Sequence, residues 1–217
     1  MLKSGEPRYI VVEGPIGVGK TTLARRLAES FGSDLLLEGA EENPFLERFY
    51  QDPRSAALQT QLFFLFQRAQ QLKALRQADM FQPVRIADYI MEKDRLFAEL
   101  TLDKEEFKLY EQVYAHVTLE APQPDLVVYL QAPVEVLRRR IGERGRGYEK
   151  NMEADYLQRL SESYMQFFHN YNQAPLLIVN AAEIDFAHNQ RDYELLLEQV
   201  RKIRSGRHYF NPAQLIL

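Results

Sequence analysis

Residues 9–22 read YIVVEGPIGVGKTT and decide the fold. An apolar run typical of a buried strand leads into the spacing G-x-x-x-x-G-K-T and then into a helical pattern. Glycines let successive backbone N–H groups wrap a phosphate at a helix N-terminus, the lysine reaches the outer phosphates, and the threonine hydroxyl faces Mg²⁺. The stretch predicts a nucleotide site. Its expected members are Gly14, Pro15, Ile16, Gly17, Val18, Gly19, Lys20, Thr21 and Thr22.

A phosphate-binding loop does not by itself identify the class of nucleotide-binding protein. The chain has no N-K-x-D motif, which a GTPase would need. Asp88 ends the apolar run VRIAD and is the nearest candidate for the acidic residue of a second motif, although an aspartate there can also be a helix cap. We predict that Thr21 and Asp88 hold Mg²⁺, partly through water.

The composition sets limits on the class of protein. The 217 residues are 46% hydrophobic and 27% charged with a net charge of −4, which is typical of a globular protein and argues against a nucleic-acid polymer as partner. No apolar run reaches the roughly 18 residues of a membrane span, and the first residues lack a signal-peptide pattern, so we expect a cytoplasmic protein without membrane contact. With no cysteine, disulfides and thiolate metal sites are excluded.

Apolar runs and helical patterns alternate along the whole chain, which predicts one domain over residues 1–217. Strand-like runs follow the first one at Leu35–Glu38, Pro83–Asp88, Asp125–Leu130 and Leu176–Asn180. Helical patterns cover Lys20–Phe31, Arg54–Ala78, Lys104–Leu119, Pro133–Glu143, Met152–Asn172 and Asp192–Ser205. The alternation predicts an α/β fold with a mostly parallel sheet covered on both faces, whose ligands bind at the carboxyl ends of the strands.

A basic segment lies far along the chain from the phosphate-binding loop. Its cations are Arg138, Arg139, Arg140, Arg144, Arg146 and Lys150, and Glu143 and Glu149 are its only acids. Arg140 and Arg144 share a helical face, and glycines follow. We interpret residues 140–151 as a mobile lid that closes over a transferring phosphoryl group; a solvated helix end is the alternative.

The long helical pattern carries polar residues on an otherwise apolar side. Gln61 and Arg68 are seven residues apart and therefore only about 20° apart on one face. They can bind the edge of a base, and Asp94 offers a carboxylate partner for Arg68. Phe97 is one of several nearby aromatic residues that are available for stacking. The alternative is that these are ordinary solvated or core residues.

Taken in order, several blocks of the chain resemble the deoxynucleoside kinases, and the bacterial deoxyadenosine/deoxyguanosine kinases in particular. The blocks are EGPIGVGKTT, EENPFLERFY, the Gln61–Arg68 helix, ADYIMEKDRLFAEL, VVYLQAPVEVLRRRIGERGRGYE and, more weakly, NAAEIDF. The resemblance implies a P-loop kinase fold with a five-stranded parallel sheet, a homodimer, and transfer of the ATP γ-phosphoryl to a deoxynucleoside 5′-hydroxyl in nucleotide salvage, with Mg²⁺.

The resemblance also implies roles for single residues. The family's general base is a glutamate after the second strand, for which we favour Glu41, with Glu42 as the alternative. Catalytic charge would come from Lys20, Arg140 and Arg144. ATP would also contact Arg144, Arg146, Asp185 and Phe186. The nucleoside would contact Tyr50, Gln61, Arg68, Asp88, Asp94, Phe97 and Glu149.

One departure from the family stands out. Animal relatives carry an acidic residue followed by arginine after the third strand, whereas this chain has Asp88-Tyr89. The Arg68 and Asp94 pair resembles the class that accepts purines and cytosine, so deoxyadenosine or deoxyguanosine is the expected substrate, with deoxycytidine next. Competing interpretations are a monophosphate kinase similar to thymidylate kinase, and a non-catalytic ATP-binding module.

Overall fold

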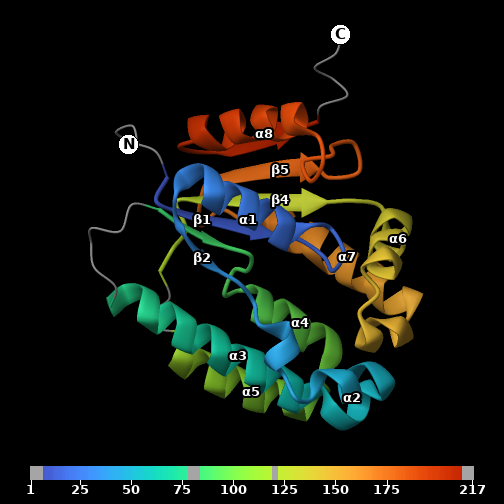
Figure 1. The fold of residues 1–217 in the computed structure, drawn as a ribbon. Helices are drawn as coiled ribbons and strands as arrows, with labels where there is room; N and C mark the ends of the chain where they lie inside the picture. The colour runs from blue at the N-terminus through green and yellow to red at the C-terminus, as the bar shows by residue number, and fades with distance from the viewer. Residues whose placement is uncertain (1–6, 78–83, 119–121, 212–217) are drawn as a thin grey trace.

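The computed structural model describes residues 7–77, 84–118 and 122–211, and its centre is one parallel sheet (Figure 1). The strand order is β2-β3-β1-β4-β5-β6, and every neighbouring pair is parallel. The strands are β1 (Tyr9–Glu13), β2 (Asp34–Leu36), β3 (Arg85–Ala87), β4 (Leu126–Gln131), β5 (Leu176–Asn180) and β6 (Arg207–Phe210). The predicted α/β class is confirmed.

The sheet has six strands, so the expected count of five was wrong by one. The additional strand, β6, pairs with β5 at the edge of the sheet. Its sequence is RHYF, and only Phe210 is buried. An edge strand with three exposed residues carries no apolar run, so it leaves no signal of the kind that marks buried strands.

Helices surround the sheet and extend beyond one of its edges. They are α1 (Lys20–Phe31), α2 (Leu46–Gln51), α3 (Pro53–Gln77), α4 (Lys93–Thr101), α5 (Lys104–Val117), α6 (Val134–Arg144), α7 (Ala154–Asn170) and α8 (Gln190–Lys202), with two 3₁₀ turns, η1 (Ala40–Glu42) and η2 (Gly147–Asn151). The predicted helices are present within a few residues, while α2 and α4 were not expected. The predicted ends Ala78, Leu119 and Pro83 lie outside the described residues.

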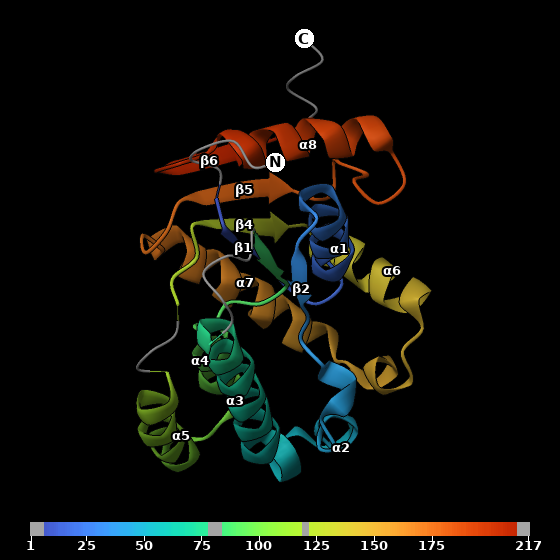
Figure 2. The same ribbon diagram turned by 60° about the vertical axis from the view of Figure 1, so that its left-hand side comes forward.

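The helices form layers on both faces of the sheet (Figures 1 and 2). On one face, α1 and α8 lie side by side, and the Tyr193 hydroxyl donates to the Arg26 carbonyl at 2.7 Å. On the other face runs α7, whose Phe168 ring stacks on Tyr129 of β4 with centroids 4.2 Å apart. Helices α2 to α5 pack together beyond the β2 edge of the sheet. No described helix has both the length and the apolar character needed to cross a membrane.

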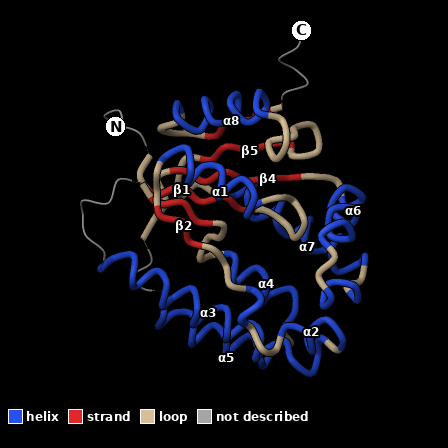
Figure 3. The backbone as a smooth tube through the Cα atoms, in the orientation of Figure 1, coloured by secondary structure: helices blue, strands red, loops and turns tan. Residues whose placement is uncertain are grey.

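Strand β1 lies at the centre of the core. Ile10, Val11 and Val12 are completely buried, as expected for β-branched residues covered on both faces. Helix α1 follows and ends at Gly32, whose left-handed backbone lets its N–H reach the Ala28 and Glu29 carbonyls. The loops after β1, β4 and β5 leave the sheet on the side of α6 (Figure 3). Loop side chains from distant parts of the chain therefore meet at that edge.

Candidate active site

The phosphate loop (residues 14–21) joins β1 to α1. Gly14 has a φ of +148°, and a Cβ on it would lie 2.3 Å from the Leu130 carbonyl oxygen of β4. Only glycine fits this approach. The Lys20 ammonium lies over the loop and donates to the carbonyl oxygens of Gly14 at 2.8 Å and Pro15 at 3.2 Å. Burial and the neighbouring Lys93 ammonium lower the pKa of Lys20 to about 7.

A fully buried carboxylate, Glu13, supports the loop from below. Its Oε1 accepts from the Gly14 N–H at 2.9 Å and from the Tyr164 hydroxyl at 3.0 Å. Its Oε2 accepts from the Ile90 N–H at 2.9 Å. The carboxylate therefore connects the phosphate loop to α7 and to the segment that follows β3, which fixes the loop against two other elements.

The predicted magnesium pair is in contact. The Thr21 hydroxyl donates to Asp88 Oδ2 at 2.6 Å, and Asp88 Oδ1 accepts from the Glu38 N–H at 2.8 Å. Among the described residues there is no group of three His, Asp or Glu side chains that would hold a metal unaided. One hydroxyl and one carboxylate beside a phosphate loop fit Mg²⁺, which usually keeps several waters and binds substrate phosphates.

Two cavities meet at the phosphate loop. The inner cavity, about 430 Å³, lies between the loop and helices α2, α3 and α4. The outer cavity, about 1000 Å³, lies between the loop, the end of α6 and residues 182–188. Both are lined by Gly17, Lys20, Thr21, Arg144 and Arg146. The junction of the two cavities is therefore cationic, and a ligand in either cavity can contact it.

The inner cavity collects the predicted nucleoside residues. Its lining includes Tyr50, Gln61, Arg68, Asp88, Phe97 and Glu149. Asp94 lies behind this wall, fully buried, where it binds the Arg68 guanidinium. Arg68 is only 3% exposed and also binds Glu38. Gln61 is held by a hydrogen bond from its Nε2 to the Thr101 hydroxyl at 3.2 Å.

Aromatic and acidic residues close the inner cavity beside the lid. The Tyr50 ring stacks on Tyr148, with centroids 5.9 Å apart and planes 14° from parallel. Tyr148 belongs to η2 and was not predicted as a site residue, because an aromatic residue beside a basic run has no distinctive spacing. Its neighbour Glu149 is buried and binds Arg144, with Arg144 Nε at 3.2 Å from Oε2.

The lid arginines have different surroundings. Arg146 pairs with Glu41 at 3.0 Å, and both side chains keep contact with solvent. Arg140 donates to the backbone carbonyls of Val18 at 3.2 Å and Ala181 at 2.8 Å. It therefore fastens α6 to the phosphate loop and to the end of β5, and burial lowers its pKa.

The outer cavity contains the predicted Asp185 and Phe186. A Cβ on Gly19 would lie 3.0 Å from the Phe186 ring, so this ring packs closely on the phosphate loop. The Phe186 carbonyl accepts from Arg26 at 2.6 Å. Asp185 Oδ1 accepts from the His188 N–H at 3.0 Å, which fixes the turn. The residues 182–188 thus form one wall of the outer cavity.

Three glutamates compete for the position facing the acceptor. The side chain of Glu41 is 69% exposed at the rim, and Glu42 accepts from Gln67 at 2.8 Å. Glu38 is only 16% exposed and is bound by Arg68 and, at 2.8 Å, by Lys93. Glu38 was missed, although it ends a predicted strand at the edge where ligands bind. Lys93 had no sequence signal at all.

Tyr89, the departure from animal relatives, does not reach either cavity. It is fully buried, and its hydroxyl donates to Gln71 Oε1 of α3 at 2.6 Å. Its side chain therefore packs α3 against β3. The cations of the inner cavity come from other residues, such as Arg68 and Lys93.

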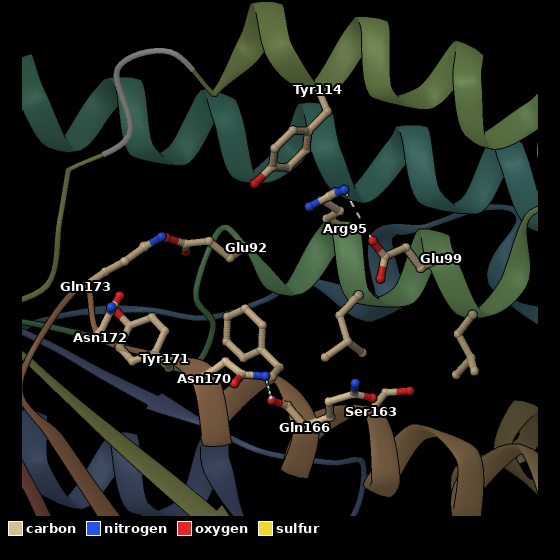
Figure 4. A pocket seen from close by; sticks show the side chains of 13 residues that line it. Glu92, Arg95, Glu99, Tyr114, Ser163, Gln166, Asn170, Tyr171, Asn172 and Gln173 are labelled. Atoms are coloured by element: carbon tan, nitrogen blue, oxygen red, sulfur yellow. Dashed lines mark hydrogen bonds and ion pairs between the residues drawn. The ribbon is translucent and has the colours of Figure 1, made fainter.

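A third cavity, about 640 Å³, lies between α4 and α7 (Figure 4). Arg95 and Glu99 reach it from α4, Gln166 and Asn170 from α7, and Tyr114 from α5. Its lining includes no residue of the phosphate loop and none of the predicted site residues. The chemistry described above is therefore concentrated at the inner and outer cavities.

Comparison with known proteins agrees with this geometry. The family profile described as "Deoxynucleoside kinase" matches residues 10–205. A deoxyguanosine kinase of Bacillus subtilis is 36% identical over 203 residues, covering 90% of this chain and 97% of the relative. A deoxyadenosine kinase of Lactobacillus acidophilus is 28% identical, covering 89% and 94%. The structure of deoxyadenosine kinase from M. mycoides with bound dATP aligns with a TM-score of 0.78 at 26% identity, covering 89% of this chain and 98% of that one.

Proposed function

Because the chain belongs to the deoxynucleoside kinase family, we propose that it transfers the γ-phosphoryl group of ATP to the 5′-hydroxyl of a purine deoxynucleoside. The observation that carries the proposal is the meeting of two cavities at Lys20 and Thr21. ATP occupies the outer cavity with its phosphates at the loop, and the nucleoside occupies the inner one. Deoxycytidine is the next candidate, since one relative is a deoxyadenosine/deoxycytidine kinase.

The base of the nucleoside is recognised by Gln61 and Arg68, which line the inner cavity, and Asp94 contributes from behind the wall by binding Arg68. One Asp94 oxygen and the Arg68 Nε are buried without a hydrogen-bond partner, although the two side chains bind each other. Buried polar atoms of this kind are stabilised by a ligand that supplies partners. A purine edge offers both donors and acceptors. Tyr50 and Glu149, at the lid end of the same cavity, then hold the 3′-hydroxyl.

Glu38 is the proposed general base. It accepts the proton of the 5′-hydroxyl as that oxygen bonds to the γ-phosphorus and the bond from the γ-phosphorus to the bridging oxygen breaks. Glu38 lines the inner cavity, and its backbone N–H donates to Asp88, the partner of Thr21. Glu41 also lines this cavity but lies at the rim beside Arg146. We therefore prefer Glu38 to the sequence-based candidates Glu41 and Glu42, which the experiment below includes.

Cations at the junction stabilise the charge that builds up on the phosphoryl oxygens. Lys20 comes from the phosphate loop, and Arg144 and Arg146 come from the lid. Arg140 contributes by holding α6 on the loop through its two carbonyl contacts. Thr21 and Asp88 would hold Mg²⁺, which neutralises phosphate charge when it is bound.

A homodimer in the cytoplasm remains the family-based expectation. A measurement of the molar mass in solution tests whether the protein is a dimer.

The test is ATP consumption with Mg²⁺ and a panel of deoxyadenosine, deoxyguanosine, deoxycytidine, thymidine, adenosine and dTMP. We expect turnover with purine deoxynucleosides that is lost in Lys20→Met and kept in Lys104→Met, since Lys104 is exposed and lines neither cavity. Turnover with dTMP alone would identify a monophosphate kinase. ATP binding without acceptor-dependent turnover would identify a binding module.

Glutamine variants of the three glutamates assign the base. Glu38→Gln should lower kcat by about 10³-fold, within the range for loss of a general base. Glu41→Gln should cost less than about tenfold, because its carboxylate is exposed and its pairing with Arg146 is partly solvated. Glu42→Gln is expected to behave similarly. A larger loss in Glu41→Gln than in Glu38→Gln would return the role to Glu41.

A further inference from the structure

The inner cavity is lined by a second lysine, which is buried and has no role in the reaction as described so far. Lys93 is the first residue of α4, lines the cavity and is only 4% exposed. A buried ammonium is costly unless it is paired, and an apolar side chain of similar length would fill the same space at lower cost. Packing alone therefore does not account for a lysine at this cavity wall.

The contacts of Lys93 identify what it acts on. Its Nζ donates to Glu38 Oε2 at 2.8 Å and lies 3.8 Å from Glu13 Oε1. It also stands 5.5 Å from the centre of the Phe97 ring. Glu13 is the carboxylate that supports the phosphate loop, and Glu38 faces the acceptor. The Lys93 ammonium thus connects Glu13, which supports the phosphate loop, with Glu38, the proposed general base.

The two oxygens of Glu38 are held by different cations. Arg68, from α3, binds Oε1, and Lys93, from α4, binds Oε2. Each carboxylate oxygen has a second lone pair, so both contacts leave room for a hydroxyl donor. Two contacts from different helices fix both the position and the plane of the carboxylate, which a single contact would leave free to rotate.

We propose that Lys93 is a positioning residue for phosphoryl transfer, which acts through Glu38. It orients the Glu38 carboxylate towards the acceptor hydroxyl. Because Lys93 also lies near Glu13, it fixes the position of Glu38 relative to the phosphate loop. The inference rests on the proposed function. It predicts an effect on kcat, because a misplaced proton acceptor slows the chemical step while leaving the contacts of base and sugar in place.

The test compares Lys93→Met, which removes the charge at similar length, with Lys93→Arg, which keeps a cation. Lys104→Met is the matched control, since Lys104 is also the first residue of a helix but is exposed. We expect Lys93→Met to lower kcat by about 10²-fold, with each KM changed less than about threefold. Lys93→Arg should recover at least about tenfold of that loss, and Lys104→Met should match the parent chain.

A double-mutant cycle with Glu38→Gln tests whether the effect passes through Glu38. If it does, adding Lys93→Met to Glu38→Gln should cost less than about threefold in kcat. Multiplicative losses would overturn the proposal, because Lys93 would then act independently of Glu38. Thermal unfolding of every variant excludes a loss of folded protein as the cause.

The outcomes also separate this inference from the proposed function. A parent chain without deoxynucleoside kinase activity would end the proposed function, and the inference with it. An active parent chain together with a fully active Lys93→Met, or with a loss confined to KM, would overturn only the inference. A deficit equal in Lys93→Met and Lys93→Arg would likewise overturn it, because charge would then be irrelevant.

Discussion

The inner and outer cavities share five lining residues but are built in different ways. The outer cavity draws its walls mainly from three short runs, the phosphate loop with the start of α1, the end of α6, and residues 182–188. The inner cavity is assembled from the loop after β2, from α2, α3 and α4, and from the lid. The donor side therefore depends mainly on local backbone geometry, and the acceptor side on how distant elements pack.

The chemistry of the two cavities follows the same division. Phosphate recognition uses consecutive backbone N–H groups, so a contiguous motif is sufficient to specify it. The wall of the inner cavity instead carries charge pairs, Arg68 with Asp94 and Lys93 with Glu38. These pairs exist only after two helices, α3 and α4, and the loop after β2 have come together.

The largest effect should follow from disturbing the backbone of the donor side. Gly14→Ala places a Cβ 2.3 Å from the Leu130 carbonyl at a φ that alanine rarely adopts. We expect a loss of at least about 4 kcal/mol in the free energy of unfolding and loss of ATP binding. Denaturant unfolding and ATP titration measure both.

Gly142→Ala is the control for this substitution, since a Cβ there meets nothing within 4 Å and the glycine lies within α6. Helix propensity predicts a gain of up to about 1 kcal/mol. Equal behaviour of the two alanine variants would contradict the view that the loop backbone decides the donor side.

A somewhat smaller effect should follow from breaking the charge pair of the acceptor side. Arg68→Met leaves Asp94, which is fully buried, without its cation. We expect a loss of about 3 kcal/mol in the free energy of unfolding, together with loss of nucleoside binding and retention of ATP binding. Calorimetric titration with each ligand separates the two cavities.

Arg95→Met is the matched control for that charge pair. Arg95 pairs with Glu99 at 3.4 Å and Glu111 at 2.9 Å, but all three side chains are exposed. Its loss should cost less than about 1 kcal/mol. If Arg68→Met abolished ATP binding as strongly as nucleoside binding, the two cavities would not bind their ligands independently.

The smallest effect should be an increase in the free energy of unfolding when Lys20, at the junction of the two cavities, is replaced. The unfolded chain keeps Lys20 protonated up to a pKa of 10.5, whereas the folded chain lowers that pKa to about 7. Between these values the unfolded state binds more protons, so the free energy of unfolding rises with pH, and the penalty is largest at and below about pH 7. Lys20→Met should therefore stabilise the nucleotide-free protein by about 1–2 kcal/mol at about pH 6.5, since the side chain is only half-buried.

The same gain should shrink at about pH 9.5, because the folded Lys20 is then neutral in the parent chain. Thermal unfolding at both pH values measures the difference, with Lys104→Met as the control. A gain that grew with pH would show that the penalty does not come from the buried ammonium.

Sequence reasoning succeeded where one segment carries its own signal. The runs at Tyr9–Glu13 and Leu176–Asn180 are strands with the expected bounds, because both are covered on each face and therefore carry several consecutive apolar residues. It failed at β6, whose exposed side chains carry no such pattern, and at α4, where the polar residues Lys93 and Asp94 are buried. Lys93 lies in this helix and was missed, whereas Asp94 was named from the sequence as the partner of Arg68, which it contacts.

The sequence by itself determined the α/β fold, the phosphate loop and the family, because short-range spacing and hydrophobic period specify strands, turns and helix starts without reference to distant residues. The tertiary structure alone decided which glutamate is enclosed by buried cations at the inner cavity. Glu38, Glu41 and Glu42 lie within five residues and look alike in sequence. They differ in exposure and in the partners that the folded chain brings to them: Arg68 and Lys93 for Glu38, the half-exposed Arg146 for Glu41, and Gln67 for Glu42.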